Sequence, residues 1–349
     1  MRIESRFLAD LLKSLEENII GLDTDGHPDE VSQETINKAT VAFLEKLEAT
    51  APRRLRKERK DRKQFERHVQ KIWGRAFDLL ETFRVLALEI GADFNEQHRP
   101  TASRDRDSVF EVLTRLHARA CQVSSEVLVL LKSGYATGAH ARWRTLHEIA
   151  VVAQFVCENG PDVAERYLDH AAITYRKAMR SYQKNCKTLG LEPISEVVLE
   201  EIEAARNAAI ERHGPDFKYD YGWAAKALSN TRPTFADIEN AVSLERLRYV
   251  FTEANIAVHA GSLAVQLNPG LHPSKEDLIL AGPSSYGLAD PTHDTATSLY
   301  QITVAMLRLR PTPKYSVVLE AMERLIQMIN FELHAAHAVE DSTYARPDD

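Results

Sequence analysis

The chain has few cysteine, glycine, proline and aromatic residues. Its 349 residues include 14 glycines, 14 prolines and three cysteines, which are Cys121, Cys157 and Cys186. The cysteines are far apart and odd in number, which excludes paired metal-ligand spacing and disfavours a disulfide framework. Scarce glycine and proline favour long helices, and an aromatic content of 7% does not suggest a β-rich core.

Membrane and export signals are also missing from the sequence. No run reaches the roughly 18 apolar residues that span a bilayer. The first 20 residues contain acids and have no long apolar core, unlike a signal peptide. The formal charge of −7 argues against generic polyanion binding by the whole surface. We therefore expect a cytoplasmic protein with no membrane association.

Several catalytic motifs are absent as well. The sequence has no glycine-rich phosphate loop, HExxH, paired CxxC or GxSxG. Their absence weighs against nucleotide hydrolases, zinc proteases and serine hydrolases. We therefore expect no metal and no cofactor, while metal-independent acid–base chemistry stays open.

The apolar residues recur at helical spacing along most of the chain, which predicts an all-α multi-helix bundle with an N-terminal helical extension. The first helix is expected over residues 1–20 and the second over 30–49, ending before Pro52. The polar segment ADFNEQHRPTASRDRDS is expected to be irregular and to separate an N-terminal region (1–100) from a helical core (105–340). A loop with a short hairpin is expected at 270–290.

A basic run extends from Arg53 to Arg75. It could contact a phosphate backbone, and neutralising several of its charges would then flatten the salt dependence of RNA binding. The alternative is a solvated helix face with internal Glu–Arg pairs. The run lacks interleaved aromatic residues for base stacking, which favours the solvated face. In either case we expect it to be helical and exposed.

Two helices carry polar stripes where a core helix should be apolar. In GYATGAHARWRTLHEIAVVAQFVC, four polar side chains share about a third of the circumference at roughly 100° per residue. They are His140, Arg144, His147 and Glu148. In SLERLRYVFTEANIAVHAGSLAVQL, polar residues recur at spacings of four, three and four. They are Arg248, Thr252, Asn255 and His259, and Ser243 is expected to cap this helix.

The two stripes could form one catalytic site. Histidines near neutral pKa can exchange protons with a hydroxyl, and neighbouring arginines can stabilise a phosphorane, so the combination suits RNA transesterification without a metal. The candidate catalytic residues are His147, His259, Arg142, Arg144, Glu148 and Asn255. The candidate substrate contacts are Arg248, His140 and Thr252. This hypothesis requires the stripe helices to pack together and His147 or His259 to line an open pocket.

The same stripes could be a buried polar network without a ligand. Glu148 would then pair with Arg144 along its helix or with Arg248 across helices, and the network would fix the helix register. Removing Arg144 would in that case cost on the order of 3–5 kcal/mol, the range for breaking a buried ion pair. In an open site the same substitution should cost little.

Four separated segments resemble a widespread bacterial helical family, number 5677 in the series of domains of unknown function. They are SGYATGAHARWRTLHEIAVVAQFV, YDYGWA, LRYVFTEANIAVHAGS and GPSSYG, and the resemblance covers about residues 105–310. It implies a helical fold and no established activity.

A second resemblance is to the HEPN superfamily of helical ribonucleases, whose signature is Arg followed a few residues later by His. Arg142 and His147 have four residues between them, with tryptophan where HEPN proteins often have asparagine. Asn255 and His259 match the second half, with alanine in place of the arginine. The resemblance implies metal-independent RNA cleavage in a toxin or phage-defence setting, with a homodimer.

The sequence therefore predicts a HEPN-like ribonuclease or RNA-binding effector. His147 and His259 would be acid and base, three arginines would hold phosphate, Asn255 would orient the substrate and Glu148 would position Arg144. The alternative is a non-catalytic helical module that binds a protein partner or a small ligand.

Overall fold

The computed structural model describes residues 33–259, 261–266, 270–275 and 279–344. All regular secondary structure in these ranges is helical, which confirms the all-α multi-helix bundle. The chain divides into two compact units, Met1–Arg67 and His68–Asp349. The helix predicted over residues 1–20 lies outside the described residues. No helix in the described ranges is long and apolar enough to cross a membrane.

Helix α2 (Gln33–Asp105) corrects two predictions of secondary structure. It continues through Pro52, where strong helix formers on both sides outweigh the loss of one backbone donor. It also includes most of the segment predicted to be irregular, because Phe94 is buried and Arg99 pairs with Glu111 of the next helix. Every Arg and Lys from Arg53 to Arg75 is exposed and helical, as predicted.

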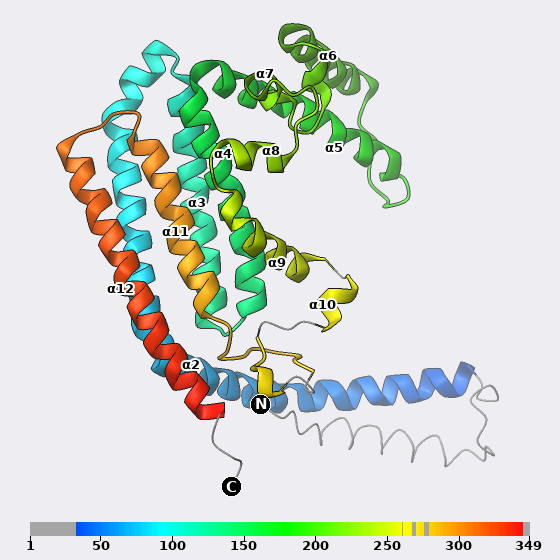
Figure 1. Cartoon of the computed structure of the whole chain (residues 1–349). Coiled ribbons are helices and arrows are strands. Elements are labelled where there is room, and N and C mark those ends of the chain that lie inside the picture. Colours follow the sequence, from blue (N-terminus) through cyan, green and yellow to red (C-terminus); the bar gives the residue numbers. More distant parts are fainter. Residues whose placement is uncertain (1–32, 260, 267–269, 276–278, 345–349) are drawn as a thin grey trace. The chain divides into compact units, whose positions relative to one another are not determined.

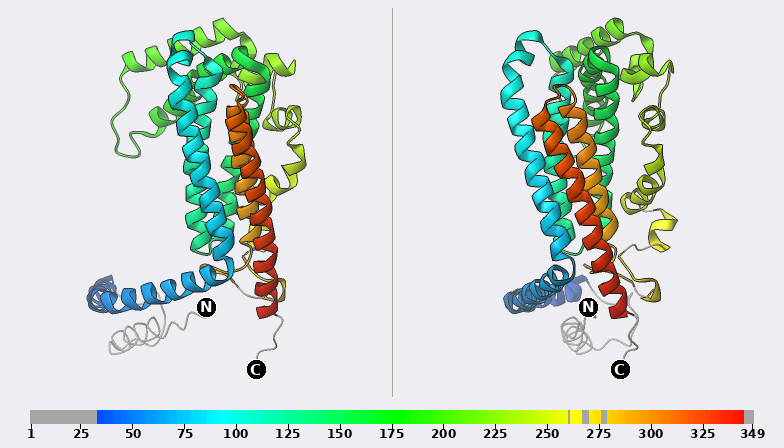
Figure 2. Two further views of the ribbon diagram at one scale, coloured as in Figure 1. Left: turned by 90° about the vertical axis from the view of Figure 1, so that its left-hand side faces the viewer. Right: turned by 60° about the vertical axis from the view of Figure 1, so that its left-hand side comes forward.

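The second unit is a bundle of long helices that run side by side (Figures 1 and 2). It consists of the second part of α2, α3 (Ser108–Lys132), α4 (Ala136–Asp169), α11 (Ala289–Leu307) and α12 (Pro313–Tyr344). Asp107 caps α3, accepting a bond from the backbone N–H of Phe110 at 2.9 Å. Large side chains fill the centre, including Trp73, Phe83, Trp143 and Tyr315.

The segment after α4 folds around a buried arginine. Helices α5 (Ala171–Asn185) and α6 (Glu196–His213) lead to a loop that contains the YDYGWA sequence. Arg166 of α4 donates to the carbonyl oxygens of Trp223 at 3.0 Å, Gly222 at 3.1 Å and His213 at 3.2 Å. Its guanidinium thus replaces the backbone donors that this irregular segment lacks.

The second stripe helix is shorter than predicted. After α8 (Phe235–Ala241), a short turn leads into α9 (Arg248–Val258), and α10 covers Ser262–Gln266. Ser243 does not cap α9, whose N-cap is Leu247. His259 is extended, with φ −107° and ψ 138°, and only its backbone N–H still bonds to Asn255. Asn255 and His259 therefore do not share a helical face.

The connection from α10 to α11 has no hairpin in its described residues. It is held instead by single contacts with the bundle. The N–H of Ser284 donates to the carbonyl of Gly134 at 2.8 Å, and the indole N–H of Trp73 donates to the carbonyl of Ser285 at 2.9 Å. The hydroxyl of Ser285 donates to the buried carboxylate of Glu340 on α12. These contacts fix the loop beside the ends of α4, α11 and α12.

Candidate functional site

The structure does not bring the Arg142–His147 pair together in one site. Arg142 turns toward α3, where its Nε donates to the carboxylate of Glu126, and its Nη1 donates to Thr145 at 3.0 Å. His147 lies against α8 instead. The two side chains therefore contact different elements of the structure.

His147 belongs to a buried ion-pair cluster with Glu239 and Arg248. His147 and Glu239 are both 0% exposed, and His147 Nε2 lies 2.6 Å from Glu239 Oε1. Arg248, at the start of α9, pairs with the other oxygen of the same carboxylate. Burial lowers the pKa of His147, and the carboxylate of Glu239 opposes that shift.

Glu239 was not among the residues predicted from the sequence. It lies on α8, a helix of seven residues without a long hydrophobic period. The signal that could have located this helix is the capping box, in which Thr234 accepts from the backbone of Asp237 and Asp237 accepts from that of Thr234. One predicted alternative paired Glu148 with Arg248 across helices. In the structure the carboxylate of Glu239 makes this ion pair.

Glu148 pairs along its own helix. Arg144 Nη2 lies 3.0 Å from Glu148 Oε1, and both side chains are partly exposed. The Arg144 guanidinium lies 4.9 Å from the centre of the Phe251 ring on α9. His147 also contacts this ring, with centroids 5.4 Å apart. The predicted packing of the two stripe helices is thus confirmed, but their polar residues meet through Glu239 of α8.

The remaining residues of the second stripe lie outside this cluster. The hydroxyl of Thr252 is exposed and donates to the carbonyl of Arg248 at 2.7 Å. Asn255 is half-buried, and its Oδ1 has no hydrogen-bond partner. His259 is exposed and lines a separate cavity. The stripes therefore divide between a buried cluster and an open site.

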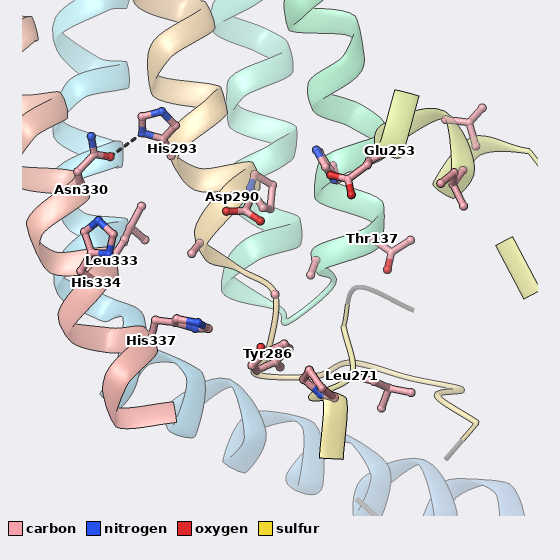
Figure 3. Close-up of a pocket in the computed structure, with 18 of the residues that line it drawn as sticks. Thr137, Glu253, Leu271, Tyr286, Asp290, His293, Asn330, Leu333, His334 and His337 are labelled. Atoms are coloured by element: carbon pink, nitrogen blue, oxygen red, sulfur yellow. Dashed lines mark hydrogen bonds between the residues drawn. The ribbon is translucent and has the colours of Figure 1, made fainter. Parts of the chain in front are cut away.

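The open site is a cavity of about 930 Å³ between α4, α9, the loop before α11, and α12 (Figure 3). Five histidines line it, and His140 and His259 are the predicted ones among them. The others, which the sequence analysis missed, are His293, His334 and His337. Two carboxylates, Glu253 and Asp290, line it as well. A sequence signal existed in HAAHA on α12, whose histidines three residues apart share one face.

At one end of the cavity, His140 faces a buried carboxyl group. His140 is 8% exposed, and its Nε2 lies 3.9 Å from Oδ2 of Asp294. Burial lowers the pKa of His140. Burial, assisted by the charges of Asp290 and Glu253, raises the pKa of Asp294 to about 7. A group that titrates there can give or take a proton near neutral pH.

At the other end of the cavity, a hydrogen bond and an ion pair orient two of the histidines. His293 Nδ1 lies 2.5 Å from Asn330 Oδ1, so that nitrogen donates and Nε2 is left as an acceptor (Figure 3). His337 Nε2 lies 3.6 Å from Asp341 Oδ2. In the described part of the chain, no three His, Cys, Asp or Glu side chains are placed to hold a metal ion. The arrangement suits hydrogen bonding and proton transfer.

The raised pKa of Asp294 predicts how the free energy of unfolding depends on pH. Between about pH 4 and 7 the folded protein binds a proton at Asp294 that the unfolded chain has released, so this group's contribution to stability falls as the pH rises through that window. The substitution Asp294→Asn removes this loss. At about pH 8 we expect the variant to be more stable than the wild type by up to roughly 4 kcal/mol, because a pKa raised by about three units costs about 1.4 kcal/mol per unit.

The gain of Asp294→Asn should shrink toward zero below about pH 4. Urea unfolding at several pH values measures the difference between variant and wild type, which cancels the opposite slope of other groups. One of these is His117, whose pKa burial lowers to about 4. A difference that does not change with pH would show that Asp294 keeps an ordinary pKa.

The fold and the cavity define an all-α helical bundle with a histidine-lined cavity that reaches the surface at His259. Residues 110–270 match the model of a family described as a family of unknown function, DUF5677. The match includes α3, α4 and α9, and it supports the resemblance to this family that the sequence predicted. No curated protein and no solved structure matches the chain.

Proposed function

We propose that the helical core binds a small polar organic ligand in the histidine-lined cavity, and that the His147–Glu239–Arg248 cluster is structural. The observation that carries the proposal is the convergence of five histidines and two carboxylates on one open cavity from α4, α9, α11, α12 and their connecting loop. Residues distant in sequence have no packing reason to gather polar groups around one open space.

The size and walls of the cavity favour a small ligand. Its volume of about 930 Å³ is near the upper end of the roughly 300–1,000 Å³ typical of small-molecule sites. Ile256, Leu271 and Leu333 supply apolar wall, while histidines and carboxylates supply directional polar contacts. Such a mixture of apolar wall and a few polar groups is typical of sites for small molecules.

The buried cluster supports the structural half of the proposal. With His147 and Glu239 at 0% exposure, a substrate could reach them only if the surrounding helices moved apart. Phe235, Phe251 and Trp143 also pack around the imidazole, with ring centroids 5.4–6.2 Å from it. The requirement that a catalytic histidine line an open pocket is therefore met by His259 and not by His147.

The test follows the histidine side chains directly. Protein labelled with ¹³C at its histidine rings is mixed with a fragment library of cations, neutral molecules and anions, and the ring signals are recorded by NMR. Ligands are expected to shift the signals of His140, His259 or His334 and to leave the buried His117 unchanged. The proposal is wrong if no fragment shifts the cavity signals.

A blocked cavity gives the matched control. Thr137 lines the cavity, so Thr137→Trp should reduce the fragment-induced shifts by occupying part of it. Ala321 is exposed on α12 and does not line the cavity, so Ala321→Trp should leave the shifts unchanged. Equal shifts in both variants would place binding elsewhere on the protein.

RNA cleavage is a second candidate, favoured by the position of His259 in a cavity with other histidines. His259 and His334 would be the base and the acid, in place of the predicted His259 and His147. A HEPN-like role in RNA cleavage or phage defence stays a prediction. Incubation with total RNA, beside the His259→Ala variant, tests it. Cleavage that disappears in this variant supports a ribonuclease, and cleavage that persists in it rejects this site.

A further inference from the structure

Three carboxyl groups gather at the end of the cavity between α9 and α11. Glu253 on α9 and Asp290 at the start of α11 face the same space (Figure 3). Asp294 lies one helical turn beyond Asp290, nearer the core. Among the described lining residues none is Arg or Lys. The charges of Glu253 and Asp290 both act unfavourably on an ionised Asp294, and a cation in this space would offset that repulsion.

Two buried polar atoms in the same place lack hydrogen bonds. His140 Nε2 and Asp294 Oδ2 have no hydrogen-bond partner, and at 3.9 Å they are too far apart to bond well with each other. His140 lines the cavity and is 8% exposed. Buried polar groups in folded proteins are almost always hydrogen-bonded, so the unpaired Nε2 of His140 on the cavity wall, with the unpaired Asp294 Oδ2 behind it, indicates a place for a ligand's polar group.

The walls of this space also carry apolar side chains. Ile256 and Val258 follow Glu253 on α9, and Leu333 projects from α12. A ligand whose polar head reached the carboxylates would place its remaining atoms against these side chains. The cavity thus has one acidic, hydrogen-bonding end and one apolar wall.

We propose that the cavity takes a protonated organic amine, with its ammonium group between Glu253 and Asp290 and its hydrocarbon part against Ile256 and Leu333. This inference rests on the proposed ligand-binding function and specifies the chemical class of its ligand. An ammonium group donates three hydrogen bonds, which matches carboxylate oxygens that converge from two helices. Tyr249 donates to Glu253 at 2.7 Å and so helps to orient that carboxylate.

Two other ligand classes fit less well. An anion would meet the like charges of Glu253 and Asp290. A divalent metal ion would need a set of three ligating side chains, and the described residues provide none. An organic cation uses the charge of the acidic end and the apolar wall together.

Three probes of nearly the same shape test the charge of the ligand. They are 2-phenylethylamine, 2-phenylethanol and phenylacetate, titrated into the full chain at about pH 8, where the amine is protonated. Calorimetry gives the affinities, and the ¹³C-histidine signals locate the binding. The amine is expected to bind at least about tenfold more tightly than the alcohol, and phenylacetate is expected to bind most weakly.

Charge-removing variants test the residues. Glu253→Gln and Asp290→Asn should each lower the affinity for the amine by about tenfold and leave the affinity for the alcohol unchanged. The control is Glu323→Gln, since Glu323 is exposed on α12 and does not line the cavity. Amine affinity that survives both cavity variants would overturn the inference.

The outcomes separate this inference from the function on which it rests. The amine proposal is wrong if the alcohol or phenylacetate binds the cavity as tightly as the amine. It is also wrong if library fragments bind there and none of them is a cation. In both cases the proposed binding of a small ligand still stands. Zn²⁺ alone shifting the same histidines more strongly, with reversal by EDTA, would overturn the amine in favour of a metal. If no probe and no fragment shifts the cavity histidines, the proposed function itself fails.

Discussion

Replacing Glu239 with alanine is expected to lower the free energy of unfolding by about 3–5 kcal/mol, the range for breaking a buried ion pair. Glu239 is 0% exposed and accepts from His147 at 2.6 Å, while its second oxygen pairs with Arg248. Removing the carboxylate leaves a buried imidazole and a guanidinium without their partner, and it opens a cavity between α4 and α8. Urea unfolding followed by circular dichroism measures the loss.

Glu148→Ala is the matched control for this prediction. Glu148 also pairs with an arginine of the stripe, but the pair is partly exposed and links residues four apart on one helix. Such pairs contribute about 0.3–0.5 kcal/mol, so this variant should be nearly as stable as the wild type. If Glu239→Ala costs no more than Glu148→Ala, the buried cluster does not hold α4, α8 and α9 together.

Gly222→Ala is expected to cost about 3 kcal/mol or more, because the added methyl group has no space. A Cβ at Gly222 would lie 2.3 Å from the carbonyl oxygen of Asp216 and 2.7 Å from the Cα of Phe217. Both neighbours are backbone atoms, which cannot rotate away as a flexible side chain would. Relief of the clash would displace the carbonyl that accepts from Arg166 at 3.1 Å.

Gly261→Ala provides the comparison, since a Cβ there meets no atom within 4 Å. Its effect should lie within about 0.5 kcal/mol of zero, as for most open surface positions. Thermal and urea unfolding of the two variants measure the contrast. A Gly222→Ala variant as stable as Gly261→Ala would mean that the loop does not pack against its own backbone in solution.

The helical class could be predicted from local sequence, together with some of the helix boundaries. Asp107, a residue type that favours the N-cap, caps α3, and the sequence Asn159-Gly160-Pro161 lies at a break in α4, where Gly160 has φ 73°. The errors arose where tertiary contacts override local preference. Pro52 does not end α2, and the polar residues before Asp105 stay helical because Phe94 and Arg99 pack against α3.

The site could be predicted only in part. Periodicity correctly marked α4 and α9 as helices with polar faces, but it could not tell which polar residues are buried together. Glu239 completes the His147 cluster from a short helix, and His334 completes the cavity from the far end of the chain. His259 was assigned to the face of Asn255 because the period was continued past Val258, where the helix ends. Long-range contacts of this kind leave no local pattern.

A crystal structure of the full chain with 2-phenylethylamine, or with the tightest-binding fragment, tests the central claim most directly. That claim is that the histidine-lined cavity, and not the buried stripe cluster, is the functional site. We predict ligand density between α9, α11 and α12, with the polar head within hydrogen-bond distance of Glu253 or Asp290. Density against His147 and Glu239, or only at sites outside the cavity, would contradict it.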